Sequence, residues 1–483
     1  MNPSTHAILA VLVVLSIGTF VIAMRPARWS ALLLPGLTIL LFALPRAGFT
    51  LPQLHLPLPV AHGLCALLIL EWLVLRPKHR LEPEPRLGSY LLAYATVAGL
   101  ALAIGLTSQG RHVVSFLELC FYLFSIGLFF YASETFSRRE DFLRFIRWIL
   151  IVSLAVSAYG LAQVRWGSSV LVEHVTYNTG GSTLSRTYLE TGDQTGMRVL
   201  SSYGDPNVLA SQLLVFAGIG LALLLGRRIR GRHRALGLLV LVANVACIVY
   251  TGSRAALVGM ILVTLVVLCW QTWWTMVFLS GLAGVAVIIG WESISMYVGA
   301  GYEQLVITND MRLQFPRMAY ELVKAAPLGC GFGRHIVFQT DSATWAPSIV
   351  PAGAIWAGFN SFWLNLLSRL GLAGVAAFVT LLVVVFRYLW RQSRRVESRF
   401  VQAALVGLAA GFLGQWFIWL ANNTYMLPGG GLNFWFMLGM AVAGARAFDP
   451  AAQWVEPMRA EAPAFAAAPM GGAVAFQGEG PAR

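Results

Sequence analysis

Long apolar runs recur along almost the whole of this 483-residue chain, and they constrain its fold more than any other feature. Charged residues make up only 11% of the chain, whereas a soluble globular domain carries about 25%. A run of roughly 20 apolar residues can cross the hydrocarbon core of a bilayer as a helix. The sequence therefore predicts an all-α polytopic integral membrane protein. This length rule gives about 13 spans, within a range of about 12 to 14, at residues 7–24, 29–44, 60–75, 87–106, 113–131, 142–164, 206–225, 236–250, 255–269, 275–290, 361–389, 401–421 and 433–448.

Basic residues are concentrated in four connections between these spans, at residues 76–86, 138–147, 227–234 and 387–399. If the spans alternate in direction, all four connections fall on one side, which the positive-inside rule assigns to the cytoplasm. The two long loops, 165–205 and 291–360, then face outward, with the N-terminus outside and the C-terminus inside. The net charge of +13 is explained by loop arginines beside anionic membrane lipids, so nucleic-acid binding is not expected.

The chain divides into a transmembrane domain, residues 1–448, and a tail, residues 449–483. The tail is rich in alanine, proline and glycine without a helical period, which predicts a disordered cytoplasmic extension. The sequence contains no CxxC, HExxH or paired-histidine spacing typical of metal sites. We therefore expect neither a metal nor a cofactor.

The first outward loop carries Arg165, Arg186 and Arg198 and ends in Asp205-Pro206. Asp before Pro is typical of a helix start, with the Asp as N-cap and the Pro at the first helical position. Arg198 is a candidate for binding an anionic substrate, and Arg186 is a further substrate-binding candidate. The alternative is that Arg198 pairs with Asp205 or with a lipid phosphate.

Arg254 follows Tyr250-Thr251-Gly252-Ser253 in a tight outward connection between two spans. We expect Ser253 to cap the following helix. A helix N-terminus offers free N–H groups and a positive dipole, so an arginine there predicts an anion site. The alternative is an arginine that anchors the span end by extending its charge into the headgroup layer.

The second outward loop contains apolar residues at helical spacing, which predicts an amphipathic helix over residues 309–324 along the outer face. Pro316 should start or kink this helix. The apolar stripe consists of Met311, Phe315, Met318, Leu322 and Ala325.

The same helix carries two arginines with different neighbours. Glu321 and Lys324 follow Arg317 by four and seven residues, so the three side chains lie on one face of the helix and can pair with one another in solvent. Arg317 remains a substrate-binding candidate. Arg312 has no such neighbour and is the stronger ligand candidate, although Asp310 is a local alternative partner.

A glycine-rich turn, residues 329–333, follows the helix. No strand precedes it, so a dinucleotide-binding motif is excluded by its context. Its glycines, among them Gly331 and Gly333, indicate that the backbone bends sharply or approaches another group closely. Arg334 and His335 come next. A histidine outside the membrane is often simply solvated, but His335 could instead titrate near the working pH and act in catalysis.

These motifs, in this order against the spans, resemble the O-antigen ligase and O-antigen polymerase family over about residues 198–386. The residues that carry the resemblance are Arg198, Gly252-Ser253-Arg254, Asp310-Met311-Arg312, the turn from Pro327 to Gly333, and Asn360-Ser361-Phe362-Trp363 through Gly371-Leu372-Ala373-Gly374.

The resemblance implies a GT-C-like, metal-independent glycosyltransferase of the bacterial inner membrane. Its donor would be a glycan linked to polyprenyl diphosphate, and its acceptor a lipid-linked repeat unit or lipid A core; a chain-length regulator is a further candidate partner. Arg198, Arg254 and Arg312 match family arginines, and guanidinium groups bind phosphate oxygens bidentately. With His335 they form the expected catalytic set, while Arg186, Arg317, Gly331, Gly333, Arg334 and Asn360 are the expected substrate-binding residues.

One departure from the ligase pattern concerns Phe359-Asn360, where ligases carry His-Asn. Either His335 or a carboxylate of Glu303, Asp310 or Asp341 replaces the missing histidine, or the protein does not use the ligase acceptor. The second explanation favours a polymerase, with the ligase reaction as the alternative. A lipid-linked glycan flippase is a more distant alternative, because transporters place polar residues at mid-membrane in two related halves, which this sequence does not show.

Overall fold

The computed structural model describes the helical bundle and the outer elements that pack on it. The described residues are 42, 48–51, 56–59, 63, 65–70, 85–107, 112–136, 138–166, 199, 201–203, 205–271, 315–338, 347–351, 359, 361–425 and 430–449. The expected spans 7–24 and 275–290, most of 29–44 and 60–75, and most of the tail 449–483 lie outside them.

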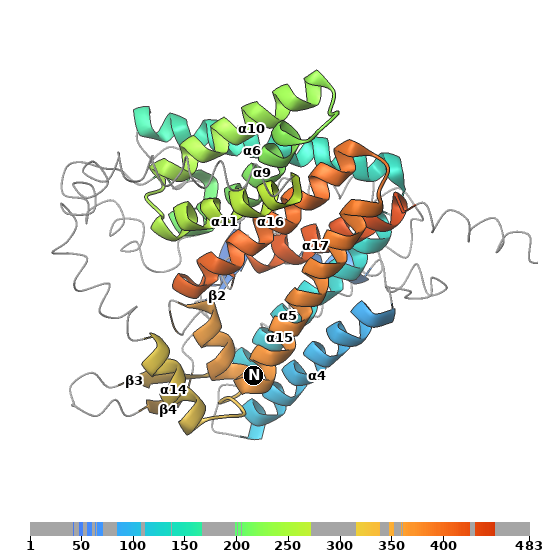
Figure 1. The fold of residues 1–483 in the computed structure, drawn as a ribbon. Coiled ribbons are helices and arrows are strands. Elements are labelled where there is room, and N and C mark those ends of the chain that lie inside the picture. Colours follow the sequence, from blue (N-terminus) through green and yellow to red (C-terminus); the bar gives the residue numbers. More distant parts are fainter. Residues whose placement is uncertain are drawn as a thin grey trace, which may run out of the picture.

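Nine expected spans are present as helices in the described part of the chain: α4 (Pro85–Thr107), α5 (His112–Thr135), α6 (Arg139–Trp166), α9 (Pro206–Leu225), α10 (Gly231–Tyr250), α11 (Arg254–Gln271), α15 (Phe362–Arg395), α16 (Arg399–Ala421) and α17 (Gly431–Ala447). By length and composition, α4, α6, α9, α10, α15 and α16 can cross a membrane. The protein is therefore a mostly helical, polytopic membrane protein (Figure 1).

Several helices extend beyond the predicted apolar runs. Helix α10 begins at Gly231 instead of Leu236, and α15 continues past Leu389 to Arg395. The added residues include arginines, whose long side chains let a helix continue into the headgroup layer. The start of α9 matches the prediction: the Asp205 carboxylate accepts hydrogen bonds from the Asn207 and Val208 amides at 2.8 and 3.0 Å.

Helix α9 lies at the centre of the bundle. Of its apolar stretch, 89% of the residues are buried. The corresponding share is 28% in α4 and in α10, whose exposed apolar faces are expected for surfaces that face lipid. Glycines allow α9 and α16 to approach closely: a Cβ at Gly218 would lie 2.6 Å from the Gly407 carbonyl oxygen. Small residues at such positions are typical of helix packing in membranes.

Contacts near the helix ends show which ends lie together. Gln415, late in α16, donates a 2.9 Å hydrogen bond to Ser211, early in α9. Ser361, directly before α15, lies 3.4 Å from the Trp419 carbonyl, also late in α16. The starts of α9 and α15 and the end of α16 therefore share one end of the bundle. Gly259 packs on Gly414, which brings the start of α11 to the same end. We call it the site end.

The opposite end holds most of the described arginines, and we call it the arginine-rich end. Its contacts include the Arg139 side chain, which donates to the Ala447 carbonyl at 2.9 Å. The expectation that the basic connections share one side is confirmed for the three described ones. The arginines at this end include Arg138, Arg139, Arg144, Arg147, Arg227, Arg228, Arg230, Arg232, Arg234, Arg387, Arg391, Arg394, Arg395, Arg399 and Arg446.

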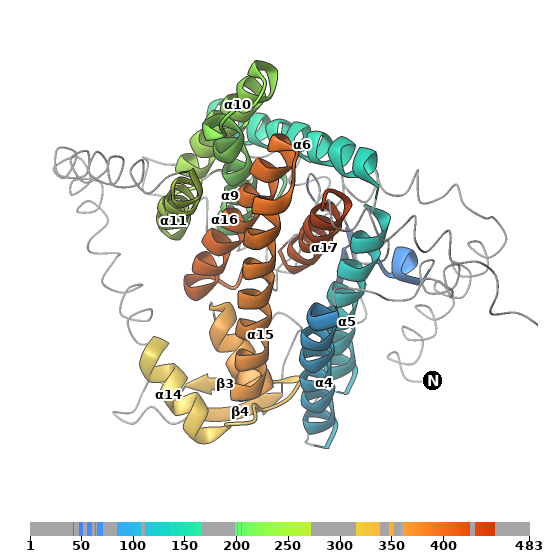
Figure 2. The same ribbon diagram turned by 45° about the vertical axis from the view of Figure 1, so that its right-hand side comes forward.

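The all-α expectation needs one correction, because the described residues include two small antiparallel hairpins. Strand β1 (Gly48–Leu51) pairs with β2 (Leu56–Pro59), and β3 (Arg334–Phe338) pairs with β4 (Pro347–Pro351). The second hairpin and helix α14 (Phe315–Ala325) lie beside α15 at the site end in both views (Figures 1 and 2). These strands are five residues long or shorter, too short for a clear alternation signal in the sequence.

Candidate functional site

Helix α15 is broken near the site end of the bundle. Gly371 has φ 66° and ψ −165°, so the backbone leaves the helical conformation there. The Leu372 amide beyond the break donates to the Pro327 carbonyl at 3.0 Å. The glycine-rich turn thus replaces a hydrogen bond that an unbroken α15 would make within itself.

The backbone carbonyls that precede the break also find hydrogen-bond partners in the same turn. Cys330 donates its amide to the Ser368 carbonyl at 2.7 Å, and Gly331 donates to the Arg369 carbonyl at 3.2 Å. Non-helical backbone inside a membrane protein persists where the protein supplies such partners. The turn is therefore a structural part of the bundle and not a free surface loop.

The turn glycines adopt the left-handed region, with φ of 82° at Gly329, 80° at Gly331 and 74° at Gly333. A Cβ at Gly331 would lie 2.5 Å from the Gly105 nitrogen of α4. The prediction of close backbone approach is confirmed, and the group approached is the protein itself. The structure gives the amides of Gly331 and Gly333, both expected to bind substrate, partners within the chain.

Phe332 forms the tip of the turn and enters the space between α4 and α5. Its amide donates to the Ala101 carbonyl at 3.1 Å, and its carbonyl accepts from the Ser115 hydroxyl at 2.9 Å. Its ring centroid lies 5.2 Å from that of Tyr122. These interactions join the turn to α4 and α5, so three helices and the turn hold one another in place.

A buried ion pair lies directly beneath the turn. The guanidinium of Arg369 on α15 is 2.9 Å from the carboxylate of Glu118 on α5, and their side chains are 1% and 0% exposed. The other carboxylate oxygen of Glu118 accepts from the Gly333 amide at 2.9 Å. Sequence reasoning missed this pair. The available signal was one acid within one apolar run and one base within another, since such residues face the bundle interior and pair with one another.

His335 lies on β3, next to this ion pair. Its ring is half-buried, and its Nδ1 is buried without a hydrogen-bond partner among the described residues. Burial and then the positive charge of Arg369 lower the pKa of His335 below its usual 6.5. Because the imidazole is then neutral at pH 7, it can accept a proton. The partial burial of the ring agrees with neither a fully solvated side chain nor a fully enclosed one, and the catalytic role of His335 stays a prediction.

Two neighbours of His335 differ in their chemistry. Burial, which outweighs the nearby arginines, raises the pKa of the Cys330 thiol to about 11, so the thiol is protonated at neutral pH and is no nucleophile. Arg334, half-buried on β3 opposite Pro351, is a basic side chain beside the same turn. Strand β3 thus contributes one imidazole and one guanidinium beside the turn.

Phe359, which stands where the resemblance places a histidine in ligases, packs against the protein's own residues. Its amide donates to the Asn365 side chain at 2.8 Å, and its ring centroid lies 5.9 Å from that of Phe338 on β3. Side chains alternate along a strand, so His335 lies on the opposite face of β3 from Phe338. His335 therefore does not fill the space beside Phe359, although the same strand carries it.

Arg254 is the first residue of α11, at the site end, and its side chain is exposed. It forms no salt bridge with a described residue. The expectation that Ser253 caps α11 needs correction. Its hydroxyl is buried but has no hydrogen-bond partner in the described part of the chain. Ser253 instead donates its amide to the Thr251 hydroxyl at 3.3 Å. An exposed arginine, an unpaired buried hydroxyl and a helix N-terminus therefore lie side by side.

The backbone beside Arg198 reaches the same connection. The amide of Val199, the next residue, donates to the Tyr250 carbonyl at 3.0 Å. Arg198 itself lies outside the described residues, as do Arg186, Arg312, Asn360, Glu303, Asp310 and Asp341. Their proposed roles remain predictions.

Helix α14 has the amphipathic character that was predicted, with Met318 and Leu322 buried against α15 and the hairpin. One member of the predicted stripe is misplaced, because Ala325 is exposed and Ala326 packs inward instead. The proline lies in the first described turn, as expected. Arg317 is exposed in that turn, and residues 309–314 lie outside the described part.

The structure therefore gathers Gly331, Gly333, Arg334 and His335 around the Glu118–Arg369 pair, while Arg254 stands on a separate element at the same end. Among the described residues, no cluster of three His, Cys, Asp or Glu side chains could hold a metal ion. The described part of the site end thus holds a half-buried histidine beside the ion pair and, on a separate element, an exposed arginine at a helix start. No known protein family matches the chain, and no curated protein matches its sequence.

Proposed function

We propose that the protein is an inner-membrane polymerase of a surface polysaccharide, either O-antigen or exopolysaccharide. In this proposal it has about 13 spans by the length rule and a GT-C-like architecture. It transfers a glycan from polyprenyl diphosphate to the next lipid-linked repeat unit. The resemblance over residues 198–386 suggests this reaction, and the arrangement at the site end is compatible with it.

The observation that carries the proposal is the start of α11. Ser253 is 2% exposed and its hydroxyl is unpaired among the described residues, and Arg254 beside it has no carboxylate partner there. Free N–H groups at a helix N-terminus favour a bound anion. A hydroxyl, a guanidinium and these amides together suit the diphosphate of the donor, and they stabilise the negative charge that gathers on it in the transition state.

His335 is the proposed acceptor-side base. An acceptor hydroxyl attacks the anomeric carbon of the donor, the new glycosidic bond forms, and the bond from that carbon to the diphosphate oxygen breaks. The proton of the hydroxyl passes to His335, and polyprenyl diphosphate leaves with the electron pair. A neutral imidazole at working pH is required for this role, and the lowered pKa of His335 meets that requirement.

The orientation follows from the charge of the two ends. The arginine-rich end faces the cytoplasm by the positive-inside rule, so the site end faces the periplasm. A lipid-linked donor that has been translocated presents its diphosphate at this outer headgroup level. In this proposal Arg254 and His335 therefore lie at the same membrane face as the diphosphate of the donor.

A flippase is the alternative to compare, because α15 is broken and a charged pair is buried beside the break. Transporters build substrate sites from broken helices whose free backbone groups bind the substrate. Here Cys330, Gly331 and Leu372 already use the backbone groups freed by the break. A Cβ added at Gly329 would lie only 2.4 Å from the Arg369 carbonyl oxygen, so this space is filled. The break therefore favours a structural role over a transport site.

The test is a deletion strain that is complemented with variants and analysed for surface polysaccharide. Arg254→Ala should reduce polymer by about 10²-fold or more, the usual loss for a transition-state interaction, with normal protein abundance. Arg165→Ala removes an exposed arginine at the same end and serves as the matched control. Undiminished polymer in Arg254→Ala would remove this residue from the site.

The deletion phenotype separates the reaction classes. Lipid A core capped by a single repeat indicates a polymerase. Core without glycan, together with accumulated lipid-linked polymer, indicates the ligase reaction. Repeat units that accumulate on the cytoplasmic side indicate a flippase and would contradict the proposal.

A further inference from the structure

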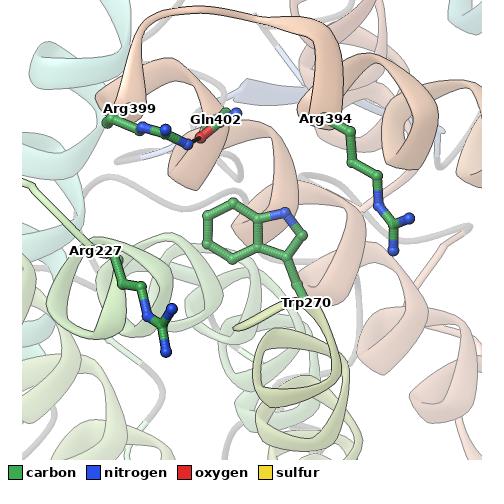
Figure 3. A pocket seen from close by; sticks show the side chains of 6 residues that line it. Arg227, Trp270, Arg394, Arg399 and Gln402 are labelled. Carbon is green, nitrogen blue, oxygen red and sulfur yellow. Dashed lines mark hydrogen bonds between the residues drawn. The ribbon is translucent and has the colours of Figure 1, made fainter. Parts of the chain in front are cut away.

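A cavity of about 260 Å³ lies at the arginine-rich end of the bundle, away from the proposed active site. It opens between the turn after α9, the end of α11, the end of α15 and the start of α16. Figure 3 shows the indole of Trp270 between Arg227 and Arg399 on one side and Arg394 on the other. The lining residues are Gly226, Arg227, Trp270, Arg394, Arg399 and Gln402.

Two of the three arginines are held in place by neutral neighbours. Arg399 donates to the side-chain oxygen of the buried Gln402 at 2.8 Å. The Arg394 guanidinium lies over the ring of Trp390 at 5.4 Å, and that ring stacks on Phe386 at 5.9 Å between centroids. Such interactions fix the position of a guanidinium and leave its charge unneutralised.

The cavity is therefore strongly positive. Arg227, Arg394 and Arg399 form no salt bridge with any carboxylate in the described part of the chain. Unpaired like charges around one cavity repel one another, so an anion that occupies it would stabilise all three. At about 30 Å³ per water molecule, the volume has room for a phosphate group and several waters.

The surroundings favour a lipid phosphate. Val383 on α15 is 48% exposed, and it lies eleven residues before Arg394, close to three helical turns, so both lie on one face of the helix. An acyl chain along this apolar face would bring its headgroup to the arginine. Trp270 at the cavity is also typical of the headgroup level.

We propose that this cavity binds a phosphate group, supplied by an anionic phospholipid of the leaflet at the arginine-rich end. Arg227, Arg394 and Arg399 hold the phosphate oxygens, and the indole of Trp270 packs between them. Bound lipid would join α9, α11, α15 and α16 at this end. The site is separate from the proposed glycosyl transfer and does not depend on it.

The test measures the thermal stability of purified, delipidated full-length protein in detergent on titration with phosphatidylglycerol or phosphatidylcholine. Phosphatidylglycerol should raise the Tm at low lipid concentration, and phosphatidylcholine should not. Removal of the cavity arginines should weaken the apparent affinity by at least about tenfold for each charge-assisted hydrogen bond that is removed. The test variant combines Arg227→Ala, Arg394→Ala and Arg399→Ala. The control removes the same charge at the same end and combines Arg232→Ala, Arg387→Ala and Arg391→Ala.

The outcomes separate the alternatives. Retained binding in the control and loss in the cavity variant support the proposal, and native mass spectrometry should show one fewer tightly bound phospholipid. If inorganic phosphate raises the Tm equally well, the phosphate site stands and its ligand is soluble. Equal responses of the cavity variant and the control overturn the site. Should the triple variant fail to fold, Arg394→Gln alone must still show weaker lipid binding, or the proposal fails.

Discussion

The buried Glu118–Arg369 pair gives the sharpest prediction about how the site is held together. Arg369→Met removes the charge but keeps an unbranched side chain of similar length. Glu118, 0% exposed, then retains only the Gly333 amide as a described partner. Breaking a buried pair by removing one member typically costs about 3–5 kcal/mol, because an uncompensated charge stays buried.

The opposite single change, Glu118→Gln, should cost a similar amount for the same reason. The glutamine oxygen can still accept from the Gly333 amide, so this loss comes from the Arg369 charge, which no longer faces a carboxylate. The double variant Glu118→Gln/Arg369→Met removes both charges and keeps that hydrogen bond. Additive effects would give about 6–10 kcal/mol, whereas a pair that matters through its charges predicts a double variant at least as stable as either single variant.

Thermal unfolding in detergent, followed by intrinsic fluorescence and by recovery of monodisperse protein, measures this order. Both single variants should have a much lower Tm than the wild-type protein, and the double variant should recover part of the difference. Single variants with the wild-type Tm would show that the ion pair is not formed. Strictly additive losses would refute the charge argument and leave the shapes of the two side chains as the source of the stabilisation.

Three further predictions concern the turn, the base and the orientation. Gly331→Ala should destabilise the protein by more than about 1 kcal/mol, because φ is 80° and the new Cβ would press on α4; Gly231→Ala, with nothing within 4 Å, is the matched control in the same thermal assay. If His335 is the base, the acid limb of the rate profile should have its midpoint below pH 6.5, since its lowered pKa keeps the ring neutral there; a midpoint above 6.5 would contradict this. Cysteine placed at position 254 should react with an impermeant reagent from the periplasm, while cysteine at position 232 should be protected, and the reverse result would invert the proposed orientation.

The spanning helices were predictable because a long apolar run carries its own signal, independent of the rest of the chain. Helix α9 matched the expected residues 206–225 because Asp205 and Pro206 mark its start by local chemistry. The connection before α11 shows the limit of such reasoning. Ser253 has the right residue type and spacing for a cap, yet its hydroxyl makes no hydrogen bond with the described residues.

The features that depend on tertiary structure were not predictable. Glycine is common in membrane helices, so the break at Gly371 became visible only with the turn from Pro327 that satisfies it. Likewise, nothing local connects Glu118 with Arg369, because only the fold brings α5 against α15. The sequence did indicate the glycine turn as a place of close approach. It could not reveal that the turn approaches the protein's own helices.

Reconstitution of the purified protein in liposomes with a polyprenyl-diphosphate-linked oligosaccharide tests directly whether it polymerises glycans. The products are separated by size, and released polyprenyl diphosphate is measured in parallel. A polymerase should give a ladder of longer lipid-linked glycans, with one polyprenyl diphosphate released for each new linkage, and Arg254→Ala should lose both signals. Movement of the intact donor across the bilayer, without any new linkage or released diphosphate, would contradict it.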